Sequence, residues 1–70
     1  MHRMTNSEGL RPVTIEFEGR TITGSYRISR EIITVTSSGG SKRAHIGPFQ
    51  RYPENLARLM LRELAVEGRV

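Results

Sequence analysis

The sequence contains no cysteine, no aspartate and no tryptophan, and it has only two histidines. Without cysteine the chain can form neither a disulfide nor a thiolate metal site. Two histidines without aspartate make a poor set of metal ligands. These absences exclude a disulfide scaffold and a zinc ribbon, and we expect no metal and no cofactor.

Long apolar runs are also missing. No run approaches the roughly 18 residues that a membrane-spanning helix needs, and residues 1–12 contain no apolar segment of the kind found in signal peptides. We therefore expect a cytoplasmic protein without a membrane partner.

The chain is short, and its length limits what it can do. Seventy residues form one small domain, which buries about 60% of the surface of its open chain. Such a domain leaves little room for a water-excluding cleft. Ser41, His45 and a glutamate have no spacing that supports a catalytic triad, and we interpret Glu16 and Glu18 as solvated charges. We therefore expect no enzymatic activity.

The pattern of polar residues divides the chain into two parts. Residues 1–12 are polar and aperiodic, which is typical of a flexible tail. From Val13 onward apolar and polar residues alternate or recur at helical spacing, so we expect one domain over residues 13–70.

Period-two alternation predicts a β-hairpin, with strands over residues 13–17 and 21–28 joined by a turn at Gly19-Arg20. Gly24 falls on the apolar side of the second strand. It marks either a bulge or a place where a helix packs close to the sheet.

A third strand is predicted over residues 32–36, which are dense in β-branched side chains. A turn at residues 29–31 leads into it, and the Gly/Ser-rich stretch 37–41 after it has the composition of an open loop. Residues 42–46 form a short fourth strand or stay unpaired, with Ala44 and Ile46 on the inner side.

The last segment has the pattern of an amphipathic helix. Residues 54–67 contain neither glycine nor proline. Pro53 suits the first helical turn, and Gly68 suits the position after the end. Glu54 can pair with Arg58 one turn later. The apolar positions on one side of the helix are Leu56, Ala57, Met60, Leu61 and Leu64.

Together these elements predict an α+β fold, a three- or four-stranded antiparallel β-meander packed against one C-terminal α-helix. Phe49 and Tyr52 are expected to cover the edge of the core, and the sheet face away from the helix is expected to be polar and rich in threonine. The expected strand residues of the core are Val13, Ile15, Phe17, Ile22, Tyr26, Ile28, Ile33 and Val35.

Positive charge gathers in one segment. The chain has 11 basic and 7 acidic residues, a net charge of +4, and residues 37–52 carry three basic residues and no acidic one. This segment favours a nucleic-acid hypothesis, because glycine-rich loops beside cations can bind phosphates. The candidate residues are Lys42, Arg43 and Arg51, with Arg27 and Arg58 as additional contacts.

A second hypothesis is self-association. Leu59 and Val66 lie off the apolar arc of the helix, and Ile32 lies on the outer sheet face. Burying these residues against a second chain would offset a marginal core. We therefore expect a non-catalytic protein-interaction or self-associating module, with a homodimer or another protein as partner. Weak, sequence-tolerant nucleic-acid binding is the alternative.

The segments Thr-Ile-Thr-Gly-Ser-Tyr, Ile-Thr-Val-Thr-Ser and Pro-Glu-Asn-Leu-Ala-Arg-Leu-Met-Leu-Arg-Glu-Leu together resemble short uncharacterised bacterial proteins with a small sheet and one closing helix. The resemblance covers about residues 13–67. It implies the fold and a bacterial cytoplasmic origin, and it carries no activity or binding residue.

Overall fold

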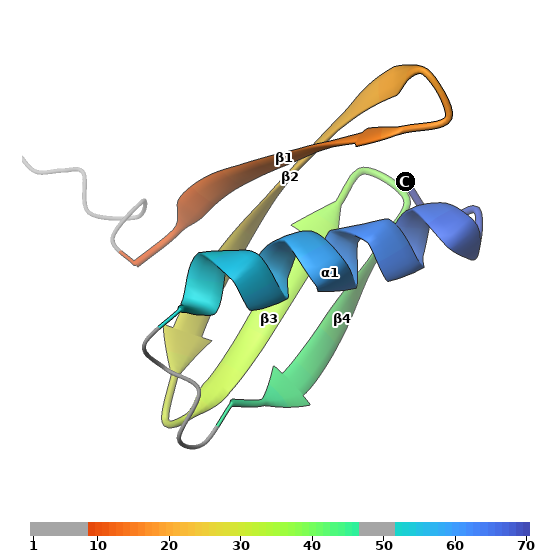
Figure 1. Ribbon diagram of the computed structural model, residues 1–70. Coiled ribbons are helices and arrows are strands. Elements are labelled where there is room, and N and C mark those ends of the chain that lie inside the picture. The colour runs from red at the N-terminus through yellow and green to blue at the C-terminus, as the bar shows by residue number, and fades with distance from the viewer. Residues whose placement is uncertain (1–8, 47–51) are drawn as a thin grey trace, which may run out of the picture.

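The computed structural model describes residues 9–46 and 52–70, which form a four-stranded antiparallel sheet followed by one helix (Figure 1). The strands lie in chain order, as the meander prediction requires. The elements are β1 (Arg11–Phe17), β2 (Arg20–Ser29), β3 (Ile32–Ser37), β4 (Gly40–His45) and α1 (Pro53–Val66).

The first two hairpins are closed by two-residue turns in the left-handed backbone region. Glu18 and Gly19 have φ of 53° and 79°, and Arg30 and Glu31 have φ of 53° and 66°. Two consecutive positive φ values are the mark of a type I′ turn, whose twist matches that of the flanking strands. The first turn was therefore predicted one residue too late, because Arg20 already pairs with Phe17 in the sheet.

The prediction of an open loop over residues 37–41 was wrong. Ser37 pairs with Gly40, so only Ser38 and Gly39 form the turn between β3 and β4. The fourth strand, left open by the sequence, is present from Gly40 to His45. Beyond its end, the Ile46 amide donates to the Glu31 carbonyl at 2.9 Å.

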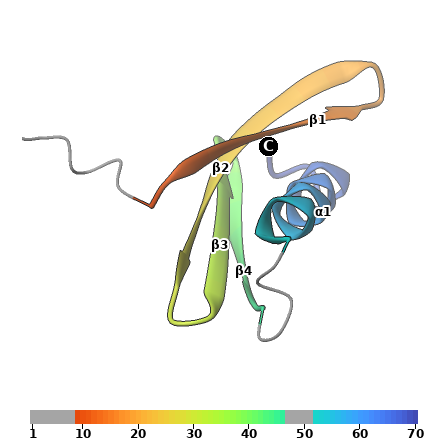
Figure 2. The ribbon, with the colours of Figure 1, turned by 60° about the vertical axis from the view of Figure 1, so that its left-hand side comes forward.

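Strand β2 connects two halves of the sheet. Its first half pairs only with β1, and its second half pairs with β3. The β1–β2 hairpin consequently extends past β3 and curves over the side of the sheet on which α1 lies (Figures 1 and 2). Strand β1 begins at Arg11, two residues before the predicted start, and residues 1–8 of the predicted tail lie outside the described residues.

Helix α1 begins at Pro53 as the sequence predicts and ends at Val66, one residue before the predicted end. Pro53 occupies the first turn, and Glu54 accepts a hydrogen bond from Arg58 at 2.8 Å. At the other end Gly68, with φ of 74°, donates to the Ala65 carbonyl, and the next amide donates to Leu64. These two bonds form a Schellman motif, which satisfies carbonyls at the helix end and turns the chain back toward the sheet.

The core lies between α1 and one face of the sheet, and most of its members were predicted. Ala65 was missed. Ile28 was wrongly assigned to the core, because it lies beyond the last residue of β2 that pairs with β1 and is 39% exposed. The buried residues are Val13, Ile22, Tyr26, Ile33, Val35, Ile46, Ala57, Met60, Leu61, Leu64 and Ala65.

The two aromatic residues expected at the edge of the core have different outcomes. Tyr52 is 64% exposed, so that prediction was wrong. It precedes the helix by one residue and lies in line with Leu59, on the side of α1 away from the sheet. Phe49 lies outside the described residues.

Gly24 marks a close approach of backbone and helix rather than a bulge. The β1–β2 register runs through it without interruption. A Cβ atom at this position would lie 2.6 Å from the Thr36 carbonyl oxygen and 3.1 Å from Leu61 Cδ1. Glycine is therefore required here by the packing of β3 and α1 around β2.

Candidate interaction surfaces

The sequence assigned the Gly/Ser stretch and Lys42 to one basic loop, but the structure places them around the end of the helix. Lys42 lies on the helix side of β4, because it is paired with the buried Val35. Its Nζ lies 2.6 Å from Glu67 Oε2 and 3.7 Å from Glu63 Oε1. Lys42 is thus held by carboxylates of this chain.

The segment after the helix lies against the β3–β4 turn. Ser37 Oγ donates to the Arg69 carbonyl at 2.8 Å, and Arg69 Nη2 donates to the Ser41 carbonyl at 3.1 Å. A Cβ atom on Gly39 would lie 2.6 Å from the Arg69 carbonyl carbon. We call Ser37, Ser41, Lys42, Glu67 and Arg69 the C-terminal cluster. Its contacts give this glycine-rich stretch a structural role.

Glu67 accepts from both cations of the C-terminal cluster. The Lys42 ammonium, and after it the Arg69 guanidinium at 3.1 Å, lower the pKa of the Glu67 carboxyl below its ordinary value. Hydrogen bonds to the ionised form have this effect because they stabilise the charge.

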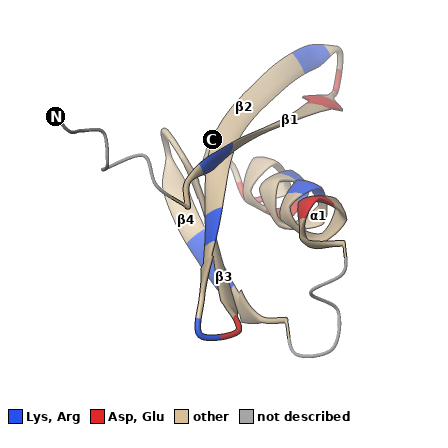
Figure 3. Cartoon of the chain, turned by 90° about the vertical axis from the view of Figure 1, so that its left-hand side faces the viewer, with Lys and Arg blue, Asp and Glu red and all other residues tan. Residues whose placement is uncertain are grey.

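Two of the predicted nucleic-acid residues do lie together, on the outer sheet face, which is the face away from α1. Arg27 on β2 and Arg43 on β4 are both paired with Thr34 on β3. We call these three residues the arginine row. Neither arginine forms an ion pair within residues 9–46 and 52–70. Figure 3 shows basic positions, drawn in blue, on the strands of the sheet as well as on α1.

Arg58, another candidate cation, does not join this row. Arg58 lies on the helix and contacts Glu54 Oε2 at 2.8 Å and Asn55 Oδ1 at 3.1 Å. Arg51 lies outside the described residues. The four described residues of this predicted set therefore do not form one surface.

The exposed apolar residues of the helix follow a straight line. Tyr52, Leu59 and Val66 are 64%, 58% and 67% exposed, and they are separated by seven residues each. At 100° per residue this spacing keeps all three on the side of α1 opposite the core. We call them the helix ridge. Ile32, the third predicted self-association residue, is half-buried on the outer sheet face, so it belongs to a different surface.

Hollows flank the helix ridge on both sides of Leu59. One of about 340 Å³ lies toward the helix start and is lined by Ala44, His45, Tyr52, Asn55, Leu56 and Leu59. The other, of about 290 Å³, lies toward the helix end and is lined by Leu59, Arg62, Glu63, Val66 and Glu67. The ridge is therefore a raised apolar line with a hollow beside each end.

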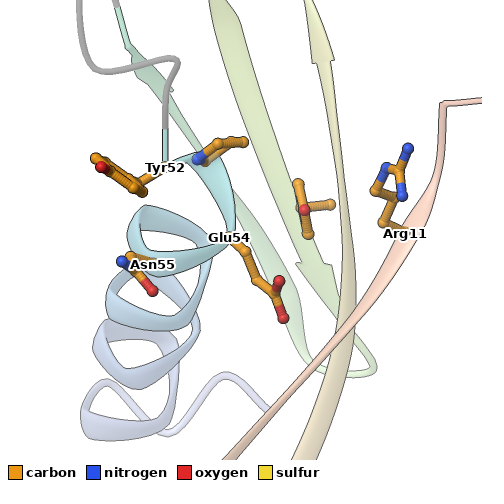
Figure 4. A pocket seen from close by; sticks show the side chains of 6 residues that line it. Arg11, Tyr52, Glu54 and Asn55 are labelled. Carbon is orange, nitrogen blue, oxygen red and sulfur yellow. The ribbon is translucent and has the colours of Figure 1, made fainter.

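A further hollow of about 380 Å³ separates the start of β1 from the start of α1 (Figure 4). Arg11 lies on one wall, with Tyr52, Glu54 and Asn55 on the other. Its described lining has no histidine, serine or cysteine that would serve as a nucleophile or base. The Glu54 carboxylate is already bonded to Arg58.

Neither a metal centre nor a membrane span is found in the described part of the chain. Within residues 9–46 and 52–70, no three histidine, cysteine or acidic side chains gather as a metal site would require. In the same ranges, α1 is too short and too polar to cross a bilayer.

Sequence reasoning missed Tyr52 as a member of the helix ridge and Thr34 as the centre of the arginine row. The seven-residue spacing of Tyr52, Leu59 and Val66 was a usable signal for the ridge. The row follows from strand register, which depends on knowing that the turns contain two residues each.

Comparisons of this chain with protein-family models, curated proteins and solved structures find no match. The function must therefore be inferred from the surfaces described above.

Proposed function

We propose that this protein is a non-catalytic, self-associating module that forms a homodimer through the helix ridge. The observation that carries the proposal is the line of three exposed apolar side chains, Tyr52, Leu59 and Val66, at seven-residue spacing. Exposed apolar residues are ordinary when scattered, but their alignment along one side of a helix favours an interaction surface.

The ridge has the symmetry that a dimer of identical chains needs. Leu59 lies midway between Tyr52 and Val66, seven residues from each. When two copies of α1 pack antiparallel about a twofold axis at Leu59, Tyr52 of one copy lies opposite Val66 of the other. The ridge would extend about 21 Å along the helix axis.

The hollows beside the ridge fit the same arrangement. The hollow at the helix end, between Leu59 and Val66, faces the ring of Tyr52 from the second copy. The apolar hollow at the helix start, beside Leu56, faces Val66 from that copy. Side chains of one helix entering hollows of the other is the usual packing of antiparallel helix pairs.

The charges next to the ridge also support a second copy as the partner. In the antiparallel pair, residues equally distant from Leu59 face each other, so Arg62 faces Leu56 and Glu63 faces Asn55. No charged residue of the ridge flanks meets a like charge at its symmetric position. Like charges meeting across the interface would oppose association.

Sedimentation equilibrium tests the dimer directly. We expect the wild-type chain to dimerise measurably at about 1 mM, where an association free energy of only about −4 kcal/mol is visible. Leu59→Glu and Val66→Glu should each give a monomer, because they place a carboxylate in the apolar contact. Thr23→Glu adds the same charge to an exposed strand position and serves as the control.

A strict monomer at this concentration would overturn the proposal. So would a dimer that persists unchanged in both helix variants, because its interface would then lie elsewhere. On the resemblance to short bacterial proteins alone, we further propose that the protein acts in the bacterial cytoplasm.

A further inference from the structure

The outer sheet face offers a second surface, independent of the helix ridge. Over the three strands β2, β3 and β4 it presents hydroxyl groups and arginines, with a histidine at one corner. The residues with this orientation are Ser25, Arg27, Ser29, Ile32, Thr34, Thr36, Ser41, Arg43 and His45.

The arginine row lies across the middle of this face. Neighbouring strands are about 4.8 Å apart, so the Arg27 and Arg43 backbones lie roughly 10 Å apart with Thr34 between them. The flanking row consists of Ser25, Thr36 and Ser41, which adds three hydroxyl groups.

The cations on the two faces of the sheet differ in whether a carboxylate neutralises them. On the helix side Lys42 is neutralised by Glu67 and Glu63. On the outer face no described carboxylate lies within ion-pair distance of Arg27 or Arg43.

The acidic residues near the outer face lie at its ends. Glu31 approaches His45 Nε2 at 3.9 Å beside one turn. Glu16 accepts a hydrogen bond from Thr21 at 3.1 Å, near the tip of the other hairpin. The centre of the face therefore keeps its positive charge.

Arginine guanidinium groups and side-chain hydroxyl groups are among the groups that commonly contact nucleic-acid phosphates. A duplex backbone presents regularly repeated negative charges, which suit two cations held at a fixed separation by a sheet. Single-stranded binders add aromatic side chains on which bases stack. The outer face has none among its described residues.

We propose that the outer sheet face binds the phosphate backbone of duplex nucleic acid with little sequence preference, through Arg27 and Arg43 with hydroxyl support. With Arg30 at the adjacent turn, two or three phosphate contacts predict a log–log salt slope of about −2 to −3. This site replaces the loop surface first expected around Lys42, and it does not require the dimer.

The test is a titration of the full chain with a short mixed-sequence DNA duplex at several salt concentrations, followed by fluorescence anisotropy of the labelled duplex. Arg27→Gln and Arg43→Gln should each weaken binding roughly tenfold at low salt and reduce the slope by about one. Arg20→Gln removes the same charge from the hairpin tip and is the matched control. All three sites are exposed, so thermal unfolding should confirm that each variant folds.

Binding that depends on Arg27 and Arg43 but not on Arg20 would support the proposal. Absence of binding at low salt, or equal losses in all three variants, would overturn it. Tighter binding of the unpaired single strand, or of a polyglutamate competitor, would also overturn it, because the recognised feature would then not be a duplex backbone. The Leu59→Glu variant should bind the duplex like the wild type, which separates this test from that of the dimer.

Discussion

At the scale of single residues, two backbone positions constrain the fold. Gly24 lies where β3 and α1 pack closely around β2, and Glu31 has a positive φ in a turn. Gly24 was singled out by the sequence because it interrupts an apolar side of a strand, and two explanations were then open. Sequence alone could not choose between them, since the choice depends on the Thr36 carbonyl and the Leu61 side chain, which are distant in the chain. The backbone strain at Glu31, in contrast, is local, because it follows from the positive φ of that residue alone.

Gly24→Ala is expected to destabilise the fold by about 1–3 kcal/mol, because the added methyl group meets the Thr36 backbone at 2.6 Å. Gly40→Ala is the matched control, since its nearest neighbour at 2.9 Å is the flexible Arg69 side chain, and its loss should be smaller. Urea denaturation measures both free energies of unfolding. A Gly24→Ala protein as stable as the wild type would contradict the close approach.

Glu31→Gly is expected to stabilise the protein by about 0.5–1 kcal/mol. Glu31 has φ of 66°, which costs a residue with a side chain about 1–2 kcal/mol, and glycine recovers more than it loses in chain entropy. Glu31→Ala removes the same carboxylate, and its weak contact with His45, but keeps the strained backbone. Thermal unfolding should therefore rank Gly above Glu and leave Ala without a gain.

At the scale of elements, the helix and the strands were largely predictable, and the turns were not. Alternation and helical spacing are local signals, so three strands and one helix could be located within a few residues, while the short fourth strand stayed open. Register depends on turn length: two-residue turns at Arg30-Glu31 and Ser38-Gly39 place Arg27 and Arg43 opposite Thr34. The predicted open loop over residues 37–41 left the register of β4 undetermined. Neither the arginine row nor the contact between Lys42 and Glu67 could therefore be predicted.

The C-terminal cluster predicts a pH dependence of stability. Glu67 has a lowered pKa in the folded chain, so its stabilising contribution is complete above the ordinary glutamate pKa and is lost as the pH falls through the lowered value. Lys42, Arg69 and nearby Glu63 are the charged groups that face it.

Glu67→Gln should therefore reduce stability at neutral pH and show a smaller further loss on acidification than the wild type. Glu18→Gln, at an exposed turn residue without a described ion pair, is the control and should follow the wild-type profile. Urea midpoints measured from neutral to acid pH test this. Parallel profiles for Glu67→Gln and the wild type would show that the carboxylate contributes nothing.

At the scale of the whole molecule, the two proposed surfaces lie on opposite sides. The helix covers one face of the sheet and the outer sheet face points away from it (Figure 2). The helix ridge lies on the side of α1 farthest from the sheet. A dimer formed through the ridge would therefore have four layers, sheet, helix, helix and sheet, with its two arginine rows on opposite outer surfaces.

This arrangement predicts that the dimer binds two separate duplexes at once and does not bind a single duplex with higher affinity. With one duplex on a surface and a second, labelled duplex in solution, the wild-type chain should retain the label. Leu59→Glu should bind the surface duplex without retaining the label, because a monomer has one outer sheet face. Arg43→Gln should weaken both steps while remaining dimeric. Retention of the label by the Leu59→Glu monomer would show that a single chain holds two duplexes, and the four-layer arrangement would then be wrong.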